Sequence, residues 1–340
     1  MPRRRAMTIS VLLPFRNEAP YLEACLTSLA GQRGPDFELV AIDDGSTDAS
    51  PEIYHSMAHR FGASLYLRTK GVGLVCALNE GLAAASGTVV ARADGDDLYH
   101  PDRLALQAGL IEQGADMVGS LTRFFPRREL QGGFRTYEAW INGLRTEADM
   151  VREIYVENPI PHPALAARRS LLNDLGGYRD MQWPEDWDLL LRAHQAGARL
   201  DKVPRLLHLW REHPRRLCRL HPAYNQLAFI RCRCHFLGRC LARGPLADGR
   251  PIFIWGAGPL GRKMTTHLRA CQVPIEGFID IDPKKIGRVV RDRPVHAPAY
   301  LERHTPFVLG CVGKRGARYE IREALEAFGY VEERDFLLAA

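Results

Sequence analysis

Apolar segments of strand length alternate with amphipathic segments through the first hundred residues. The runs TISVLLPF, FELVAID and GTVVARA are strand-like. The segment APYLEACLTSLAGQ separates the first two runs and gathers its apolar side chains on one helical face: Leu22, Cys25, Leu26 and Leu29. Strands that alternate with helices are typical of a mostly parallel sheet with helices on both faces. We therefore predict an α/β fold whose ligands bind outside the carboxyl ends of the strands.

The composition is that of an ordinary globular protein. The chain has 340 residues, of which 46% are hydrophobic, and no apolar run approaches the length that spans a bilayer. In MPRRRAMTISVLLPF a short apolar part is followed at once by Arg16 and Glu18, which we interpret as a basic tail before the first strand. The eight cysteines are scattered, which favours a reducing cytoplasm. The net charge of +6 is a mild bias toward acidic ligands or membrane surfaces, and we expect no nucleic-acid partner.

Length and local patterns predict three regions. Residues 1–220 are expected to form the first α/β domain, and residues 221–250 a basic amphipathic helix with a linker. Residues 251–340 begin with the strand-like run PIFIWGAG and are expected to form a small second α/β domain.

The run ARADGDD places three aspartates at the end of a buried strand. Asp94 and Asp96 point to the same side of an extended segment, and Asp97 follows directly. Carboxylate oxygens are the ligands that Mg²⁺ and Mn²⁺ prefer, and such ions commonly bridge to substrate phosphates. The run therefore predicts a divalent-cation site on a nucleotide diphosphate. The alternative is a solvated acidic turn before the next helix.

Two further acidic pairs occupy similar places. Asp43 and Asp44 in AIDDGSTD follow a strand and are suited to bonding a base or ribose, although an Asx-turn would also explain them. Glu185 and Asp186 in WPEDWDLLLR begin a helix, where the helix dipole alone favours acids.

Taken in order, several segments resemble one enzyme family over residues 7 to about 220. They are SVLLPFRNEAPYLEACLTSL, VAIDDGSTD, ALNEGLAAASG, ARADGDD, GGYRDMQWPEDWDLLLRAHQAG and LLHLWREHP. Together they resemble the inverting nucleotide-sugar glycosyltransferases of family 2, which have the GT-A fold. The resemblance implies a transfer of one sugar from a nucleotide-diphosphate donor, with UDP-sugars favoured. The acceptor would be a saccharide or a lipid-linked molecule in cell-surface polysaccharide or glycolipid synthesis.

The resemblance also implies roles for individual residues. Asp94 and Asp96 would be the DxD motif, with Asp96 the preferred ligand of Mn²⁺ or Mg²⁺. Asp186 would be the catalytic base. The WREHP segment carries Trp210 where the family usually has tyrosine, and His213 would join the metal site. The remaining residues implied to contact the donor are Pro14, Glu18, Asp43, Asp44, His162, Glu185 and Arg211.

Two other functions would also use parts of this pattern. A nucleotidyltransferase also uses metal carboxylates, but PFRNEAP stands where a Gly- and Lys/Arg-rich nucleotide loop would follow the first strand. A non-catalytic nucleotide-sugar sensor would have no need of a base such as Asp186.

The last hundred residues contain a glycine fingerprint. Gly256, Gly258 and Gly261 form G-x-G-x-x-G between a strand and a helix, and Asp280 follows 24 positions after the first glycine. This resembles Rossmann-type modules and predicts a site for NAD or another nucleotide. The alternative is a module that serves only packing or homo-oligomer formation.

A basic helix is predicted over residues 222–243. Its apolar positions repeat at helical spacing: Ala223, Leu227, Ile230, Cys234, Leu237 and Leu241. The stripe is expected either to pack on the protein or to support peripheral contact with the anionic inner face of a membrane.

Overall fold

The computed structural model describes residues 7–340, which group into two units. The first unit comprises the described residues through Met150 together with Pro159–Met181 and Asp188–Leu220. The second comprises Val151–Asn158, Gln182–Trp187 and His221–Ala340. Two short internal segments thus group with the C-terminal part of the chain.

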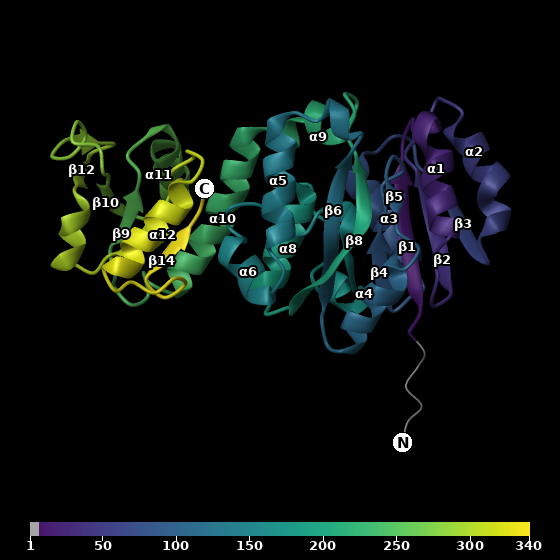
Figure 1. The fold of residues 1–340 in the computed structure, drawn as a ribbon, viewed down its shortest axis with the longest axis horizontal. Coiled ribbons are helices and arrows are strands. Elements are labelled where there is room, and N and C mark those ends of the chain that lie inside the picture. Colours follow the sequence, from purple (N-terminus) through teal and green to yellow (C-terminus); the bar gives the residue numbers. More distant parts are fainter. Residues whose placement is uncertain (1–6) are drawn as a thin grey trace, which may run out of the picture. The chain divides into compact units, whose positions relative to one another are not determined.

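An eight-stranded sheet forms the centre of the first unit (Figure 1). Its order is β3-β2-β1-β4-β7-β6-β8-β5, and β7 runs antiparallel to both of its neighbours. Strands β1, β2, β3 and β4 are mutually parallel, so their carboxyl ends lie at one edge. The strands are β1 (Ile9–Phe15), β2 (Phe37–Asp43), β3 (Ala63–Arg68), β4 (Val89–Arg92), β5 (Leu98–Tyr99), β6 (Met117–Phe125), β7 (Ala166–Arg168) and β8 (Leu200–Arg211).

Helices cover both faces of this sheet, as the alternating pattern predicts. The predicted apolar face of α1 is fully buried and joins the side chains of β1, α2 and α4 in one core. Helix α3 approaches the opposite face, where Gly81 leaves room for Ile42 and Leu12. The helices are α1 (Ala19–Ala30), α2 (Ser50–Met57), α3 (Leu74–Ala84), α4 (Arg103–Glu112), α5 (Gly132–Gly143), α6 (Glu147–Glu153), α7 (Arg169–Asp174), α8 (Glu185–Gln195) and α9 (Leu217–Leu220).

The second unit contains a smaller sheet with the order β11-β12-β10-β9-β13-β14. All pairs are parallel except that of β11 with β12, so the core follows the doubly wound pattern in which the first strand lies in the middle. Its elements are α10 (Gln226–Arg243), β9 (Ile252–Trp255), α11 (Pro259–Ala270), β10 (Ile275–Ile279), β11 (Val289–Val290), β12 (Arg293–His296), β13 (Phe307–Gly310), α12 (Ala317–Ala327) and β14 (Phe336–Leu338). The smaller sheet and the helices beside it occupy the region in which the sequence analysis expects a second α/β domain.

Helix α10 buries most of the predicted apolar stripe. Ile230, Cys234, Leu237 and Leu241 are at most 1% exposed, whereas Leu227 is 50% exposed. The stripe therefore packs within the protein. Among residues 7–340 no helix has the length and apolarity needed to cross a membrane.

Candidate active site

The acidic run lies in the loop between β4 and β5, at the carboxyl end of β4. Arg92, the last residue of β4, is 2% exposed, and its guanidinium donates to Oδ1 of Asp94 over 2.6 Å. The hydroxyl of Tyr99 lies 2.7 Å from the backbone nitrogen of Asp94. Arg92 at the end of β4 and Tyr99 in β5 thus hold the loop at both of its ends.

The end of β8 contacts this loop. His208 Nε2 lies 2.8 Å from Oδ2 of Asp97, and both side chains are fully buried. The backbone nitrogen of Arg211 donates to the other oxygen of Asp97 over 2.7 Å. The Arg211 guanidinium donates to the backbone oxygen of Asp96 over 2.6 Å, and His213 Nε2 lies 2.8 Å from Oδ2 of Asp96. The sequence analysis predicted Arg211 and His213 at this site but missed His208. The only local feature of His208 is that it lies two positions before Trp210 in the same strand.

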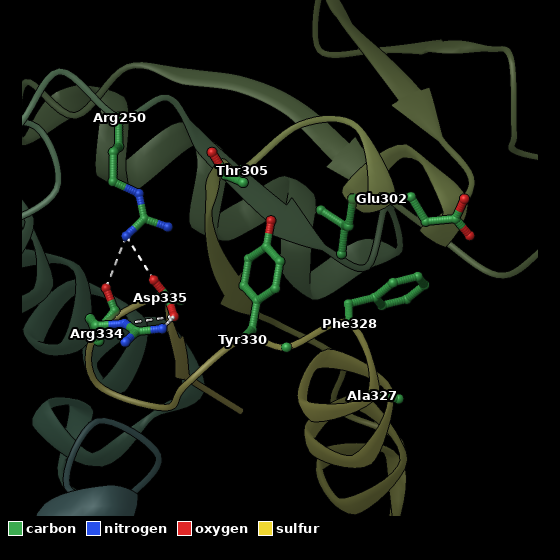
Figure 2. A pocket seen from close by; sticks show the side chains of 10 residues that line it. Arg250, Glu302, Thr305, Ala327, Phe328, Tyr330, Arg334 and Asp335 are labelled. Carbon is green, nitrogen blue, oxygen red and sulfur yellow. Dashed lines mark hydrogen bonds and ion pairs between the residues drawn. The ribbon is translucent and has the colours of Figure 1, made fainter.

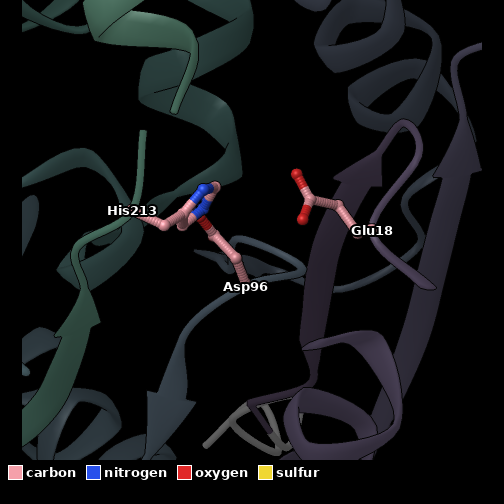
Figure 3. Close-up of side chains that lie close together, drawn as sticks. All are labelled: Glu18, Asp96 and His213. Atoms are coloured by element: carbon pink, nitrogen blue, oxygen red, sulfur yellow. The ribbon is translucent and has the colours of Figure 1, made fainter. Parts of the chain in front are cut away.

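Glu18 approaches the same place from the loop after β1 (Figure 3). Its backbone nitrogen donates to Ser50 Oγ over 2.8 Å, and the next nitrogen donates to Asp48 Oδ2 over 3.1 Å. One ligand atom each of Glu18, Asp96 and His213 lies within 4.8 Å of the others. Burial, together with the charges of Asp96 and then Asp94, raises the pKa of Glu18 to about 8.

This donor set suits a hard divalent cation. The carboxylates of Glu18 and Asp96 are ligands that Mn²⁺ and Mg²⁺ prefer, and a second group of Asp94, Asp96 and Asp97 is equally close. Nδ1 of His213 is buried without a hydrogen-bond partner among residues 7–340. The raised pKa of Glu18 also fits, because a cation would relieve the repulsion that holds its proton. The structure thus brings Glu18 close to Asp96 and His213, two of the predicted metal ligands.

Asp43 and Asp44 end β2 at the same edge of the sheet. Asp43 is fully buried and accepts from the Ser46 backbone nitrogen over 2.7 Å and from the Tyr66 hydroxyl over 2.8 Å. Asp44 accepts from the backbone nitrogens of Val72 and Gly73 over 2.9 and 3.0 Å. Both carboxylates therefore shape the surrounding loops, and their contact with a nucleoside stays a prediction.

Two other predicted donor contacts are buried in the first unit. Pro14 lies within β1 and pairs in register with Ile42 of β2. His162 is 7% exposed, and its Nε2 lies 3.0 Å from the Tyr178 hydroxyl.

Glu185 and Asp186 belong to the second unit, where they begin α8. Oδ2 of Asp186 accepts from the Asn158 amide over 2.9 Å, and Oδ1 accepts from the backbone nitrogen of Trp187 over 2.7 Å. Oε2 of Glu185 accepts from the Tyr224 hydroxyl over 2.6 Å. Asn158 was missed by the sequence analysis, because a single Asn before Pro carries no distinctive signal.

The glycine fingerprint turns from β9 into α11. Gly256 has a φ of +113°, and a Cβ on Gly261 would lie 1.9 Å from the Gly256 backbone oxygen, so packing requires both glycines. A Cβ on Gly258 would meet nothing within 4 Å. Asp280 accepts from the Ala257 backbone nitrogen over 2.8 Å and pairs with Lys285 over 3.1 Å. Burial opposes the ionisation of Asp280, but these bonds and that of the Asp282 nitrogen lower its pKa.

Two hollows lie in the second unit. One of about 520 Å³ precedes the amino ends of β9, β13 and β14, and its Arg250 and Arg334 already pair with Asp335 (Figure 2). The other, of about 540 Å³, is lined by the first turns of α11 and by residues 289–291, with Arg262, Lys263 and Arg291 among them. Only the second is at the end of the unit where doubly wound sheets bind ligands.

Comparison with known proteins identifies the family. A family model described as glycosyl transferase family 2 matches residues 10–176. A PGL/p-HBAD biosynthesis glycosyltransferase of Mycobacterium bovis is 32% identical over 210 residues, which cover 60% of this chain and 75% of that protein. This chain belongs to glycosyltransferase family 2. The uncharacterised glycosyltransferase EpsJ of Bacillus subtilis is 27% identical over 220 residues, and the match spans 62% of each protein.

The fold of a solved glycosyltransferase agrees with this assignment. Residues 1–349 of S. aureus TarS, in complex with UDP-GlcNAc, superpose with a TM-score of 0.55 at 19% identity, covering 79% of this chain and 82% of that fragment. The predicted GT-A fold and the prediction of a glycosyltransferase are confirmed.

Proposed function

We propose that this family 2 glycosyltransferase transfers a sugar from a nucleotide-diphosphate donor to an acceptor hydroxyl with inversion at the anomeric carbon. One observation carries the proposal. Glu18, Asp96 and His213 come from three distant segments and converge at the carboxyl ends of the strands. A cluster of oxygen and imidazole ligands at this edge is suited to a cation on a diphosphate.

In this proposal Asp96, His213 and Glu18 hold a divalent cation, with Asp94 beside them. The bound cation would stabilise the negative charge that grows on the departing diphosphate. Arg211 is held by the backbone of the acidic loop and stacks between the rings of Tyr21 and Phe125, at 4.7 and 4.5 Å. It supplies a fixed positive charge beside the same loop.

The acceptor oxygen forms a bond to the anomeric carbon while the bond from that carbon to the diphosphate oxygen breaks. The acceptor hydroxyl must lose a proton in this step, and we assign its acceptance to Asp186. Proton transfer to a positioned base contributes roughly 10²–10⁴-fold in rate. Asp43, Asp44, Pro14, His162 and Glu185 are proposed to contact the donor.

UDP-sugars are the favoured donors, because TarS, which shares the fold, was solved with UDP-GlcNAc. A saccharide or lipid-linked acceptor in cell-surface polysaccharide or glycolipid synthesis, and action in the cytoplasm, follow from the family resemblance alone. Mass-spectrometric screening of nucleotide sugars against the full chain would identify the donor.

Calorimetry tests the metal assignment. The Asp96→Ala variant should lose Mn²⁺-dependent binding of UDP, whereas Asp36→Ala, at an exposed position before β2, should bind as the unsubstituted chain does. Equal affinities for UDP in all three proteins would remove Asp96 from the metal site. A non-catalytic sensor is the alternative function, and the absence of donor hydrolysis by a chain that binds the donor would favour it.

We also propose that the second unit binds a nucleotide, with NAD as the first candidate. Packing explains Gly256 and Gly261 but leaves Gly258 without a structural role, and a hollow with basic side chains borders the start of α11. Titration of NAD and nucleotide sugars against the full chain tests this.

Contact with an anionic membrane is a further proposal, now limited to the exposed side of α10 with Leu227, Arg231 and Arg239. Flotation with anionic liposomes at low and high salt tests it. Formation of a homo-oligomer is likewise a proposal, which sedimentation analysis would decide.

A further inference from the structure

Residues 151–158 are held in place by the C-terminal part of the chain. Arg233 of α10 is 7% exposed and donates to the backbone oxygens of Tyr155 and Val156 over 2.7 and 2.6 Å. The side chain of Val156 belongs to the core of the second unit, among residues of β9, β13 and β14. Glu153 forms ion pairs with Arg318 and Arg322 of α12, at 3.1 and 2.8 Å. This segment is therefore fixed by α10, α12 and the smaller sheet.

Residues 182–187 are held by the same part of the chain. The Trp187 indole nitrogen donates to the Ile154 backbone oxygen over 2.9 Å, and its ring packs 5.7 Å from that of Phe229 on α10. The Tyr224 hydroxyl donates to Glu185 over 2.6 Å. The start of α8 is thus tied both to residues 151–158 and to the segment that leads into α10.

The two segments meet at Asp186. Asn158 is 6% exposed and donates its amide N–H to Oδ2 of Asp186, while the Trp187 nitrogen donates to Oδ1. Hydrogen bonds to both oxygens fix the plane of this carboxylate, which orients it for proton transfer from an incoming hydroxyl. Glu185 is its neighbour in the chain, and Glu157 lies close enough for its negative charge to interact with that of Asp186. Burial raises the pKa of Glu157 to about 7, which the negative charge of Asp186 reinforces and the Asn158 nitrogen and Arg233 oppose.

We propose that Asn158 is a positioning residue that orients the Asp186 carboxylate for proton transfer, and that Arg233 and the C-terminal unit hold Asn158 in place. The proposal rests on the proposed role of Asp186 as base. Under this proposal the C-terminal unit contributes to catalysis, because the residues that fix Asp186 come from that unit. A nucleotide bound by the same unit would then be able to change the rate of sugar transfer through the residues that fix Asp186.

The experiment compares full-length variants for donor affinity, kcat and the pH dependence of kcat. Asn158→Asp keeps the side chain's size but replaces the amide donor with a second carboxylate. We expect kcat to fall by about tenfold or more, the size expected for a lost hydrogen bond to a charged group. The acidic limb of the kcat profile should move to higher pH, and donor affinity should stay unchanged. Asn158→Gln keeps an amide donor and should recover part of kcat.

Arg233→Lys tests the link to the C-terminal unit. Lysine keeps the charge but not the planar fork that reaches two backbone oxygens, so kcat should fall at least severalfold while donor affinity is kept. The matched control is Arg243→Lys at the exposed end of α10, which should behave as the unsubstituted chain does.

Asp186→Asn separates the two proposals. If this variant keeps its turnover, Asp186 is not the base and the proposed mechanism fails. If it loses roughly 10² or more in kcat while Asn158→Asp and Asn158→Gln retain both kcat and pH profile, the mechanism stands and the positioning role of Asn158 is wrong. Variants at Asn158 that weaken donor binding instead of kcat, or an Arg233→Lys variant with unchanged kcat, would also overturn the proposal.

Discussion

Replacing Glu18 by glutamine should remove the pH dependence that this residue gives to the stability of the metal-free protein. The pKa of Glu18 is raised from 4.5 to about 8 by burial and by the charges of Asp96 and Asp94. A raised carboxyl pKa means that the folded state binds a proton more tightly than the unfolded state does. The resulting stabilisation is complete below about pH 4.5 and is lost as the pH rises through about 8.

The size of the effect follows from the two pKa values. Each pH unit between them changes the free energy of unfolding by about 1.4 kcal/mol, so the loss between about pH 5.5 and pH 8 is about 3 kcal/mol. Glutamine cannot ionise, and the Glu18→Gln variant should therefore lack this loss. At about pH 8, without metal, it should be more stable than the unsubstituted protein by up to that amount.

Urea unfolding with EDTA at the two pH values measures the effect. Glu23→Gln, an exposed glutamate on α1, is the control for the loss of one negative charge. Added Mn²⁺ should stabilise the unsubstituted protein more at pH 8 than at pH 5.5, because the cation binds the ionised carboxylate, and it should stabilise Glu18→Gln less. Stability differences between Glu18→Gln and the unsubstituted chain that are equal at both pH values would refute the reasoning.

Three more outcomes follow from the structure. Gly258→Val should abolish any nucleotide binding by the C-terminal unit without loss of thermal stability, whereas Gly261→Ala should lower stability, because its Cβ would strike the Gly256 backbone oxygen. Leu237→Ala should cost about 2–5 kcal/mol in urea unfolding, but Leu227→Ala, on the exposed side of α10, should change stability by less than about 0.5 kcal/mol. Tyr224→Phe removes the hydroxyl that bonds Glu185, a proposed donor contact, and should weaken donor binding in calorimetry.

The sequence predicted those parts of the fold that repeat locally. Strand-like runs and the apolar face of α1 follow from periodicity, and the edge of the sheet where Asp43 and Asp94 lie follows from the parallel order. The apolar stripe of α10 was recognised, but periodicity cannot state what covers a stripe. The structure shows it buried inside the protein.

Contacts between distant segments could not be predicted from the sequence. No local pattern indicates that Asp97 pairs with His208, 111 positions away, or that Asn158 reaches Asp186. The grouping of residues 151–158 and 182–187 with the C-terminal unit has the same origin, since it depends on Arg233, Phe229 and Tyr224 of a region that is linked to them only by tertiary packing.

The clustering of carboxylates at the end of β4 can be explained from the ion pairs and pKa shifts of the individual side chains. Arg92 neutralises Asp94 through an ion pair of 2.6 Å. Burial, then the charges of Asp96 and Asp94, raises the pKa of Asp97 well above its ordinary value, whereas burial lowers that of His208, so burial favours the uncharged form of each group.

Burial, with the charges of Asp96 and Asp94, likewise raises the pKa of Glu18 to about 8 and favours its protonated form. A divalent cation that bound Asp96 and Glu18 would displace the proton of Glu18. Cation binding at this site should therefore be accompanied by proton release near pH 7, which calorimetry in buffers of different ionisation enthalpy would measure. The Glu18→Gln variant should bind the cation more weakly and without that proton.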